Sequence, residues 1–314
     1  MGDRVSPAAE IAAPVTAIVT AYQRIEQTLD TLRRIEACRP RPDEILVHVD
    51  GNEVVCADAV RAAFAHLTVI VSETSVGPGG GRNKLVAAAR NKLIASFDDD
   101  SYPIDTDFFD RARTLAETFP DAALFAASIF HKNEARPEDM KVASHTASFG
   151  AGGVVFRRSE FLAAGGFVPL VVAYGMEEED LALRLLNRGR TLLRSPWLRV
   201  FHDTDLSHHS SARITSGVIA NLALLAWLRY PVSYWPYGVL QVANRVVWCI
   251  RVGRRTGILT GLAAIPPHLA RHRSLRNPVS KEAMRQRVLA RTARLKPFSQ
   301  YMTRRRSAPQ VQQK

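Results

Sequence analysis

Three consecutive carboxylates, Asp98, Asp99 and Asp100, follow the apolar stretch Leu93–Ala95. Carboxylates this close repel one another and raise each other's pKa, so their placement together calls for a partner that relieves the repulsion. A divalent cation is such a partner, because Mg²⁺ and Mn²⁺ prefer hard oxygen ligands and share them with substrate phosphates. The triplet therefore indicates a site for Mg²⁺ or Mn²⁺ beside a phosphate-bearing ligand.

The elements around this triplet alternate between strand and helix. The predicted strands cover residues 14–22, 43–51, 68–73 and 92–100, and the predicted helices cover 25–38, 55–67 and a stretch through 87–90. This alternation is typical of parallel β-α-β units, whose ligands gather at the carboxyl ends of the strands. Thr20, Tyr22 and Asp50 occupy such ends, so we expect them beside the Asp98 cluster. A solvated acidic loop is the alternative for the triplet, and its position at the ligand edge favours the cation site.

A second acidic run lies in the following half of the chain. Glu177, Glu178, Glu179 and Asp180 crowd the first turn of a helix predicted over residues 174–190. Acids at a helix start gain about 0.3–1 kcal/mol each from the helix dipole. The run therefore has two interpretations, a well-charged helix start or a set of reactive carboxylates.

A histidine ends the next predicted strand, residues 197–202. His202 can complete the ligand sphere of Mn²⁺, and its position at a strand end favours this role over a structural one. His208 and His209 lie beyond it. A zinc hydrolase built on these histidines is an alternative, but no second ligand cluster at a known spacing supports it.

The charge is distributed unevenly over the 314 residues. The whole chain carries a formal charge of +12, with +15 in residues 251–314 and −3 in residues 1–250. A basic segment of this kind suits an anionic surface such as lipid or nucleic acid. No part of it resembles a nucleic-acid-binding motif, and the acidic edge would repel phosphate in the absence of metal. We therefore expect no nucleic-acid partner.

The region ahead of this basic segment is apolar and rich in aromatic residues, with polar interruptions. Residues 214–250 contain no clean run of about 20 apolar residues, so a spanning helix is not expected. Their aromatic side chains suit the headgroup boundary, and the bases beyond favour anionic lipid. These aromatic residues are Tyr230, Tyr234, Trp235 and Tyr237. We expect peripheral attachment to a membrane; packing on the catalytic core, or on a second subunit in a homodimer, is the alternative.

The cysteines indicate the compartment. Cys38, Cys56 and Cys249 lie far apart, without the spacing of a disulfide framework or a metal site. The N-terminus shows no secretory signal pattern. We therefore expect a cytoplasmic protein, attached at the inner face of the cell membrane.

The order of the motifs resembles the inverting family 2 glycosyltransferases of the GT-A fold. The segments that carry the resemblance are VTAIVTAY (15–22), ILVHVDGN (45–52), GGGRNKLVAAARNKLIASFDDDS (79–101), GAGGVVFRRSEFLAAGGF (150–167), YGMEEEDLALRLLNRG (174–189) and FHDTD (201–205). Each motif is weak alone, whereas their order and spacing over residues 14–210 are specific. The resemblance implies an α/β fold, a Rossmann-like, mostly parallel sheet flanked by helices, with a C-terminal helical extension.

The resemblance also implies roles for individual residues. Thr20, Tyr22 and Asp50 would hold the nucleotide base and ribose, and Arg82 would approach the base or the phosphates. The three residues of the acidic triplet would have different roles. Asp98 would contact the ribose, and Asp99 would assist nucleotide and metal binding. Asp100 would bind the metal with His202. Glu178 matches the catalytic base, usually Asp in this family, and Glu177 stays open as a second candidate. Val49 stands where many members have another Asp, which leaves base recognition to Asp50.

The implied activity is metal-dependent, inverting transfer of a sugar from a UDP- or dTDP-sugar. The acceptor would be a hydroxyl of a glycan or a lipid-linked molecule, in the synthesis of cell-surface polysaccharide. A sugar-nucleotide nucleotidyltransferase is an alternative, but its glycine-rich phosphate loop follows the first strand, whereas VGPGGGR (76–82) follows the third. A non-catalytic protein that binds nucleic acid or lipid through the basic tail is another alternative.

These patterns divide the chain into four segments. Residues 1–13 form an N-terminal tail, and residues 14–210 form the GT-A catalytic domain. Residues 211–275 form an amphipathic, aromatic-rich helical region. Residues 276–314 form a basic tail that we predict to be largely disordered.

Overall fold

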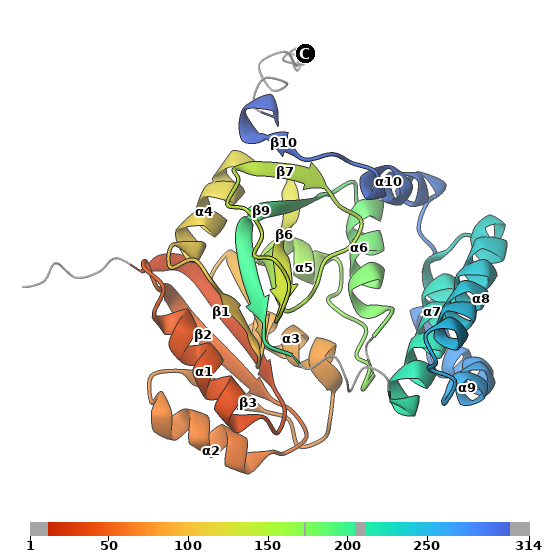
Figure 1. Ribbon diagram of the computed structural model, residues 1–314, viewed down its shortest axis with the longest axis horizontal. Helices are drawn as coiled ribbons and strands as arrows, with labels where there is room; N and C mark the ends of the chain where they lie inside the picture. The colour runs from red at the N-terminus through yellow and green to blue at the C-terminus, as the bar shows by residue number, and fades with distance from the viewer. Residues whose placement is uncertain (1–11, 173, 205–210, 302–314) are drawn as a thin grey trace, which may run out of the picture.

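A mixed ten-stranded sheet lies at the centre of the computed structural model, which describes residues 12–172, 174–204 and 211–301. Helices cover both faces of the sheet, and α7, α8 and α9 stand together at one side (Figure 1). The strand order is β10-β7-β9-β6-β8-β4-β1-β2-β3, and β5 pairs with β9 beside this path. The predicted α/β architecture with a C-terminal helical extension is confirmed.

The first third of the chain forms the parallel part of the sheet. Its elements are β1 (Ala13–Ala21), α1 (Ile25–Glu36), β2 (Pro42–Val49), α2 (Val54–Ala63), β3 (Thr68–Val71), α3 (Gly77–Ala88) and β4 (Leu93–Asp98). Along β1, Val15, Ala17 and Val19 face one hydrophobic cluster and Ile18 faces the other, because helices cover both faces of the sheet. Register pairs Thr20 with Asp98, so β1 and β4 end at the same level.

The chain then adds antiparallel pairings, which make the sheet mixed. The elements are β5 (Ser101–Pro103), α4 (Phe108–Thr118), β6 (Ala122–His131), β7 (Val142–His145), β8 (Gly153–Arg157), α5 (Arg158–Ala163), α6 (Glu177–Asn187) and β9 (Thr191–His202). Strand β8 runs antiparallel to both β4 and β6, and β6 runs parallel to β9. The short β5 pairs with the end of β9 and places Ser101 opposite His202. The end of β9 therefore meets the edge where β4 ends.

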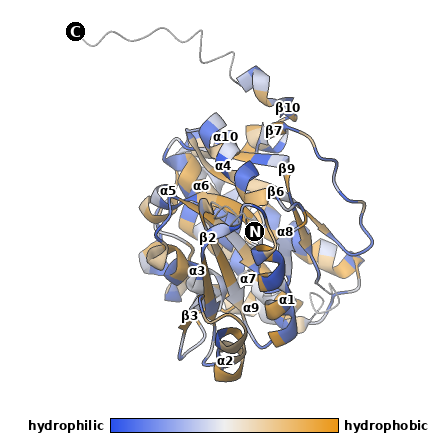
Figure 2. Cartoon of the chain, turned by 90° about the vertical axis from the view of Figure 1, so that its left-hand side faces the viewer, coloured by the Kyte–Doolittle hydropathy of each residue, from blue (hydrophilic) through white to orange (hydrophobic). Residues whose placement is uncertain are grey.

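Two hydrophobic clusters pack on the two faces of the sheet. One takes its helical side chains from α1, α2 and α4, and the other from α3, α5 and α6. The helices pack on the sheet because each has an apolar side. On α1, Leu29, Leu32 and Ile35 recur at helical spacing and are buried. In Figure 2 the central strands are mostly hydrophobic, whereas the flanking helices alternate between hydrophilic and hydrophobic segments. The strands are therefore packed between helices on both faces.

The glycine-rich segment 77–81 forms the first turns of α3, where the sequence predicted a helix only near residues 87–90. Glycine costs about 1 kcal/mol in a helix relative to alanine. Close packing explains its presence here. A Cβ at Gly79 would lie 2.7 Å from the carboxyl carbon of Glu177, and one at Gly81 would lie 2.4 Å from Nδ1 of His48. The absence of these side chains lets α3 approach its neighbours.

The C-terminal helices are fixed to the catalytic domain through α6. They are α7 (Ala212–Arg229), α8 (Trp235–Arg251), α9 (Ile258–Arg271) and α10 (Lys281–Arg291). Asp180, which is fully buried, binds Arg229 of α7 and Arg184 of its own helix. Glu179 binds Arg287 and Arg291 of α10. Among the described helices, none combines the length and the apolar character that spanning a membrane requires.

Residues 276–301 are folded, which differs from the prediction of a largely disordered basic tail over 276–314. The guanidinium of Arg287 is almost fully buried and contacts Glu179 and the Tyr230 hydroxyl, so a base in a charge run finds its partner far away in the sequence. Beyond α10, β10 (Lys296–Pro297) pairs with β7. Phe298 and Tyr301 then pack edge-to-face with the ring of Phe119. Residues 302–314 lie outside the described residues.

The buried ion pairs of Asp180 predict a large loss of stability when this carboxylate is removed. Asp180→Ala leaves two arginines without their buried counter-ion, and breaking a buried pair costs about 3–5 kcal/mol. Urea unfolding followed by circular dichroism measures the change. Asp30→Ala is the matched control, because Asp30 pairs with Arg34 at the surface of α1 and its loss costs less than about 1 kcal/mol. Equal effects of the two substitutions would contradict this account.

Candidate active site

A cavity of about 710 Å³ opens where β1, β2, β4 and β9 end. Parallel strands bring their carboxyl ends to one edge of the sheet, and the β5–β9 pairing adds the end of β9 to that edge. The cavity gathers every residue that the sequence proposed for the site. These are Thr20, Tyr22, Asp50, Arg82, Asp98, Asp99, Asp100, Glu177, Glu178 and His202.

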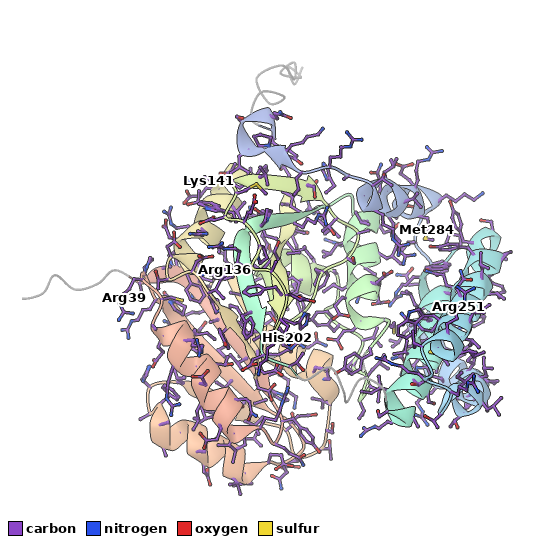
Figure 3. All side chains as sticks on the ribbon, in the orientation of Figure 1. Arg39, Arg136, Lys141, His202, Arg251 and Met284 are labelled. Atoms are coloured by element: carbon purple, nitrogen blue, oxygen red, sulfur yellow. The ribbon has the colours of Figure 1, made fainter. Side chains whose placement is uncertain are left out.

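Three of these side chains form a cluster with the composition of a cation site. One ligand atom from each of Asp98, Asp100 and His202 lies within 4.8 Å of the others. The Nε2 atom of His202 lies 3.0 Å from Oδ1 of Asp100 and 3.9 Å from Oδ2 of Asp98. Two carboxylates and one imidazole are ligands that Mn²⁺ or Mg²⁺ accepts, so these residues fit the predicted metal. Figure 3 shows His202 at the centre of the molecule, at the end of β9.

Main-chain pairing fixes this cluster. His202 is 102 positions from Asp100 in the sequence, and the β5–β9 ladder brings the two together. The backbone N–H of Asp203 donates to the carbonyl of Asp100 over 2.8 Å. The backbone N–H of Asp98 donates to the Ser101 hydroxyl over 2.7 Å. The main chain therefore fixes the backbone positions from which Asp98, Asp100 and His202 approach one another.

The electrostatics of the cluster favour an anionic Asp100. Burial alone would raise the pKa of Asp100, but the hydrogen bond and charge of His202, together with Arg24, outweigh it and lower that pKa. Burial likewise would lower the pKa of His202, but Asp100 and Asp98 outweigh it and raise that pKa. A bound cation would supply positive charge to the same two carboxylates.

The middle carboxylate of the triplet turns away from this cluster toward Arg24. Asp99 is buried, and its two carboxylate oxygens accept hydrogen bonds from Nε and Nη2 of Arg24. Burial raises the pKa of Asp99 to about 7; Arg24 opposes the increase, and Asp100 and Asp98 add to it. Asp99 is not a member of the three-residue group, although the sequence proposed it as a metal ligand.

Sequence reasoning did not identify Arg24, which also binds Asp100 through Nη1. Its side chain is 43% exposed and lines the cavity at the turn between β1 and α1. Its position in the chain could have identified Arg24 as a site residue. It is a base three residues after the end of β1, at the same sheet edge as three acids. Arg24 therefore provides positive charge beside the cluster.

Asp50 lies on the other side of the cavity, at the end of β2. Its carboxylate accepts hydrogen bonds from the Ser75 hydroxyl at 2.6 Å and from the backbone N–H groups of Val76 and Gly77 at 2.8 and 3.1 Å. These bonds fix the start of α3 against β2. The ring of Tyr22, which is 51% exposed, stands nearby as a flat apolar surface.

Arg82, which the sequence proposed to approach a base or phosphate, lines the cavity from a largely buried position. Its guanidinium donates to Ser96 at 3.0 Å and to Asp98, and it lies 3.8 Å from Glu177. Only 2% of the residue is exposed. Arg82 thus fixes the position of the Asp98 side chain.

The two candidate bases have different environments. Glu177 is 2% exposed, lies against Gly79 of α3 and accepts a backbone hydrogen bond from it. Burial raises the pKa of Glu177 to about 8; Glu178 adds to the increase, and Arg82 opposes it. Glu178 is half-buried, and burial also raises its pKa. Glu177 is thus engaged by α3, while Glu178 lies closer to the open cavity.

The rim of the cavity includes residues beyond the sequence prediction. Tyr174 comes from the loop before α6, and Arg213 and Ile214 come from the first turn of α7. A predicted set based on strand ends could not include them, because they reach the site through tertiary packing. His208 and His209, which the zinc alternative requires, lie outside the described residues.

Comparisons with known proteins agree with this geometry. The family model for Glycosyl transferase family 2 matches residues 16–154. No curated protein sequence matches the chain.

Solved structures that resemble the chain support the fold. A mannosyltransferase from Pyrobaculum calidifontis, in complex with GDP-Man and Mn²⁺, aligns with TM-score 0.55 and 16% identity, covering 95% of this chain and 87% of its own. S. aureus TarS, in complex with UDP-GlcNAc, aligns with TM-score 0.54 and 16% identity over 88% of this chain and 79% of its own. GalNAc-T7, with UDP, GalNAc and Mn²⁺, aligns with TM-score 0.57 and 11% identity over 83% of this chain and 58% of its own.

The raised pKa of Glu177 predicts how stability depends on pH. An acid whose pKa rises from 4.5 to about 8 on folding binds more protons in the folded state, so stability falls as pH rises between these values. One proton contributes at most about 1.4 kcal/mol per pH unit. Glu177→Gln imitates the protonated carboxyl and should make the curve flatter.

Urea unfolding of both proteins at pH 5, 6, 7 and 8 checks this expectation. Glu117→Gln is the control, because Glu117 lies at the surface of α4 beside Arg113. The same slope in the wild type and in Glu177→Gln would show that Glu177 does not titrate in this range.

Proposed function

We propose, from the premise that this chain belongs to glycosyl transferase family 2, that it transfers a sugar with inversion from a UDP- or dTDP-sugar to an acceptor hydroxyl. The chain is a glycosyltransferase that uses a nucleotide-sugar donor; the nucleotide, the inversion and the acceptor are the proposal. One observation carries it: a metal-type cluster and two neighbouring glutamates, the buried Glu177 and the half-buried Glu178, line the same cavity. Such a cavity can hold a diphosphate on one side and an acceptor on the other.

The donor would lie between Asp50 and the acidic cluster. Tyr22, Thr20 and Asp50 would contact the base and ribose, and Asp98 would contact the ribose, since these groups line one side of the cavity. Asp100 and His202 would hold Mg²⁺ or Mn²⁺ with Asp98 beside them. The ion, when bound, would neutralise charge on the departing diphosphate. Arg24 would add positive charge at the same place.

Glu178 would act as the catalytic base. Its carboxylate removes the proton of the acceptor hydroxyl, and the hydroxyl oxygen then attacks the anomeric carbon from the face opposite the diphosphate. The sugar passes through an oxocarbenium-like state, and a single displacement inverts its configuration. A raised pKa, which burial gives Glu178, brings a carboxylate closer to the range that suits a general base. Glu177 would position this turn by its contact with α3.

The acceptor would be a glycan or a lipid-linked molecule in the synthesis of cell-surface polysaccharide. The chain would work at the inner face of the cell membrane, with residues 14–210 as the catalytic domain. The first turn of α7 supports this proposal, because Arg213 and Ile214 bring the C-terminal helices to the rim of the cavity.

Hydrolysis of nucleotide sugars tests the donor and the metal together, because many transferases slowly transfer sugar to water. Wild type should hydrolyse a UDP- or dTDP-sugar in Mn²⁺ and not in a chelator. Asp100→Asn should reduce this activity at least about 10²-fold, because a ligand of the ion is lost. Asp99→Asn should cost about tenfold or less, because Asp99 binds Arg24. A panel that includes GDP-mannose identifies the nucleotide, and equal hydrolysis with and without metal would refute the metal role.

Substitution of the two glutamates tests the base. Glu178→Gln should lower kcat at least about 10²-fold with little change in donor affinity, because the amide keeps the shape but accepts no proton. Glu177→Gln should retain a larger fraction of kcat, because its hydrogen bond to α3 can persist. Transfer assays and titration with the nucleotide diphosphate measure the two effects. A reversed order of the two variants would make Glu177 the base.

A further inference from the structure

Helices α8 and α9 present apolar side chains to the outside of the molecule. Figure 1 shows α8 on the side of α7 that faces away from the sheet. Val239 is 70% exposed and Leu259 is 81% exposed. The exposed residues of α8 include Pro236, Val239, Leu240, Ala243, Val247, Trp248 and Ile250, and those of α9 include Leu259, Leu262, Ala263, Pro266, Pro267 and Ala270. We call these residues the α8–α9 face.

The inner sides of the same helices are apolar as well. Cys249 of α8 and Ile258 of α9 form a buried cluster with Ile219 of α7, and Val242 and Val246 pack against it. A surface helix of a globular protein is normally polar on its outer side, whereas α8 and α9 expose mostly apolar side chains beside Asn244, Thr260 and the terminal Arg251 and Arg271. An occupant for the α8–α9 face is therefore expected.

The charge around this face identifies the chemistry of the occupant. Residues 206–281 contain no Asp or Glu. Arg245 and Arg254 lie over the ring of Trp248, at 5.0 and 5.1 Å, and Arg251 and Arg255 are exposed at the same end of α8. An indole between guanidinium groups, beside apolar side chains, suits the headgroup layer of an anionic bilayer. A second copy of this face would bring like charges together, which disfavours self-association through it.

The α8–α9 face is also continuous with the rim of the cavity. A Cβ at Gly257 would lie 2.3 Å from the carbonyl oxygen of Ala212, and one at Gly261 would lie 2.9 Å from that of Ser216. Helix α9 is thus packed directly on the first turns of α7, which carry the rim residues Arg213 and Ile214. Figure 3 shows Arg251 among these helices, on the opposite side from Arg39.

We propose that the α8–α9 face docks on the surface of an anionic bilayer. The apolar side chains enter the headgroup boundary and the arginines bind lipid phosphates. Helices α7 and α10 are not part of this contact, because they pack on α6. Docking would place the rim of the cavity beside an acceptor carried by lipid; this consequence rests on the proposed function, whereas the docking itself does not.

Vesicle flotation of the full chain tests the proposal. The protein is mixed at 0.1 M salt with vesicles of phosphatidylcholine, with or without phosphatidylglycerol. Wild type should float with the vesicles that contain phosphatidylglycerol. The double substitution Val239→Glu and Leu259→Glu should reduce the bound fraction at least about tenfold, because it removes apolar contacts and adds charge of the lipid's own sign. The control is Val55→Glu, where Val55 of α2 is 71% exposed. Helix α2 lies on the opposite side of the molecule from α8 and α9 (Figure 1).

Charge reversal tests the second part of the contact. Arg251→Glu with Arg255→Glu should weaken binding at least about tenfold at 0.1 M salt, and by much less at 1 M salt, where the Debye length is about 3 Å. The control is Arg61→Glu on α2, whose side chain is 49% exposed.

Three results would overturn the proposal. In the first, the wild type does not bind phosphatidylglycerol vesicles. In the second, the α8–α9 variants and their controls lose vesicle binding equally. The third is a wild-type dimer, seen by light scattering, that Leu259→Glu dissociates without any effect on vesicles, because the face would then bind a second copy. Donor hydrolysis is measured without vesicles in every variant. Retained hydrolysis with lost flotation supports docking, and absent hydrolysis in wild type would reject the proposed function while the flotation result stands.

Discussion

The first turn of α6 is the constraint on which the rest of the structure depends. Four consecutive acids there have four different surroundings. Glu177 holds the start of α3, Glu178 lies at the cavity, Glu179 binds α10, and Asp180 binds Arg229 of α7. Because neighbouring helical positions point about 100° apart, one turn can reach four places at once. The dipole of α6 stabilises this concentration of negative charge.

This turn connects the two sides of the candidate site. The Glu177 carboxylate lies between Gly79 of α3 and the guanidinium of Arg82, and Arg82 in turn holds Asp98. The position of the metal-type cluster is therefore coupled to the position of Glu178 through a short chain of buried contacts. Buried ionic groups are costly unless every member finds a partner. The chain supplies Arg24 for Asp99 and Arg82 for Asp98, so the site is held in shape by its own charges.

The same turn also fixes the C-terminal helices. The Asp180–Arg229 pair is buried, and the buried Arg287 pairs with the half-buried Glu179. Helices α7 and α10 therefore belong to the body of the molecule, while α8 and α9 extend outward. A reaction centre, a cavity rim and an exposed basic, apolar face are thus built on one continuous scaffold. This arrangement gives a physical reason for the uneven charge of the chain: the bases of α10 neutralise α6, and the arginines around the α8–α9 face remain exposed.

The sequence by itself determined the alternation of strands and helices, because periodicity and glycine or polar ends are local properties. It also determined the candidates at strand ends, from Thr20 and Asp50 to the acidic triplet, since carboxyl ends of parallel strands share one edge. The roles of Arg82, Glu177 and Glu178 came instead from the resemblance to family 2 glycosyltransferases. Only the tertiary structure decided how the acids are used: Asp99 pairs with Arg24, and Glu177 packs on α3, which no local pattern specifies. Glycine is tolerated in the first turns of α3 because Gly79 and Gly81 lie too close to other side chains for a Cβ, which only the tertiary structure shows. The basic segment 276–301 is folded because its residues contact distant parts of the chain, as Arg287 does with Glu179, 108 residues earlier. Charge along a sequence does not reveal partners brought together by folding.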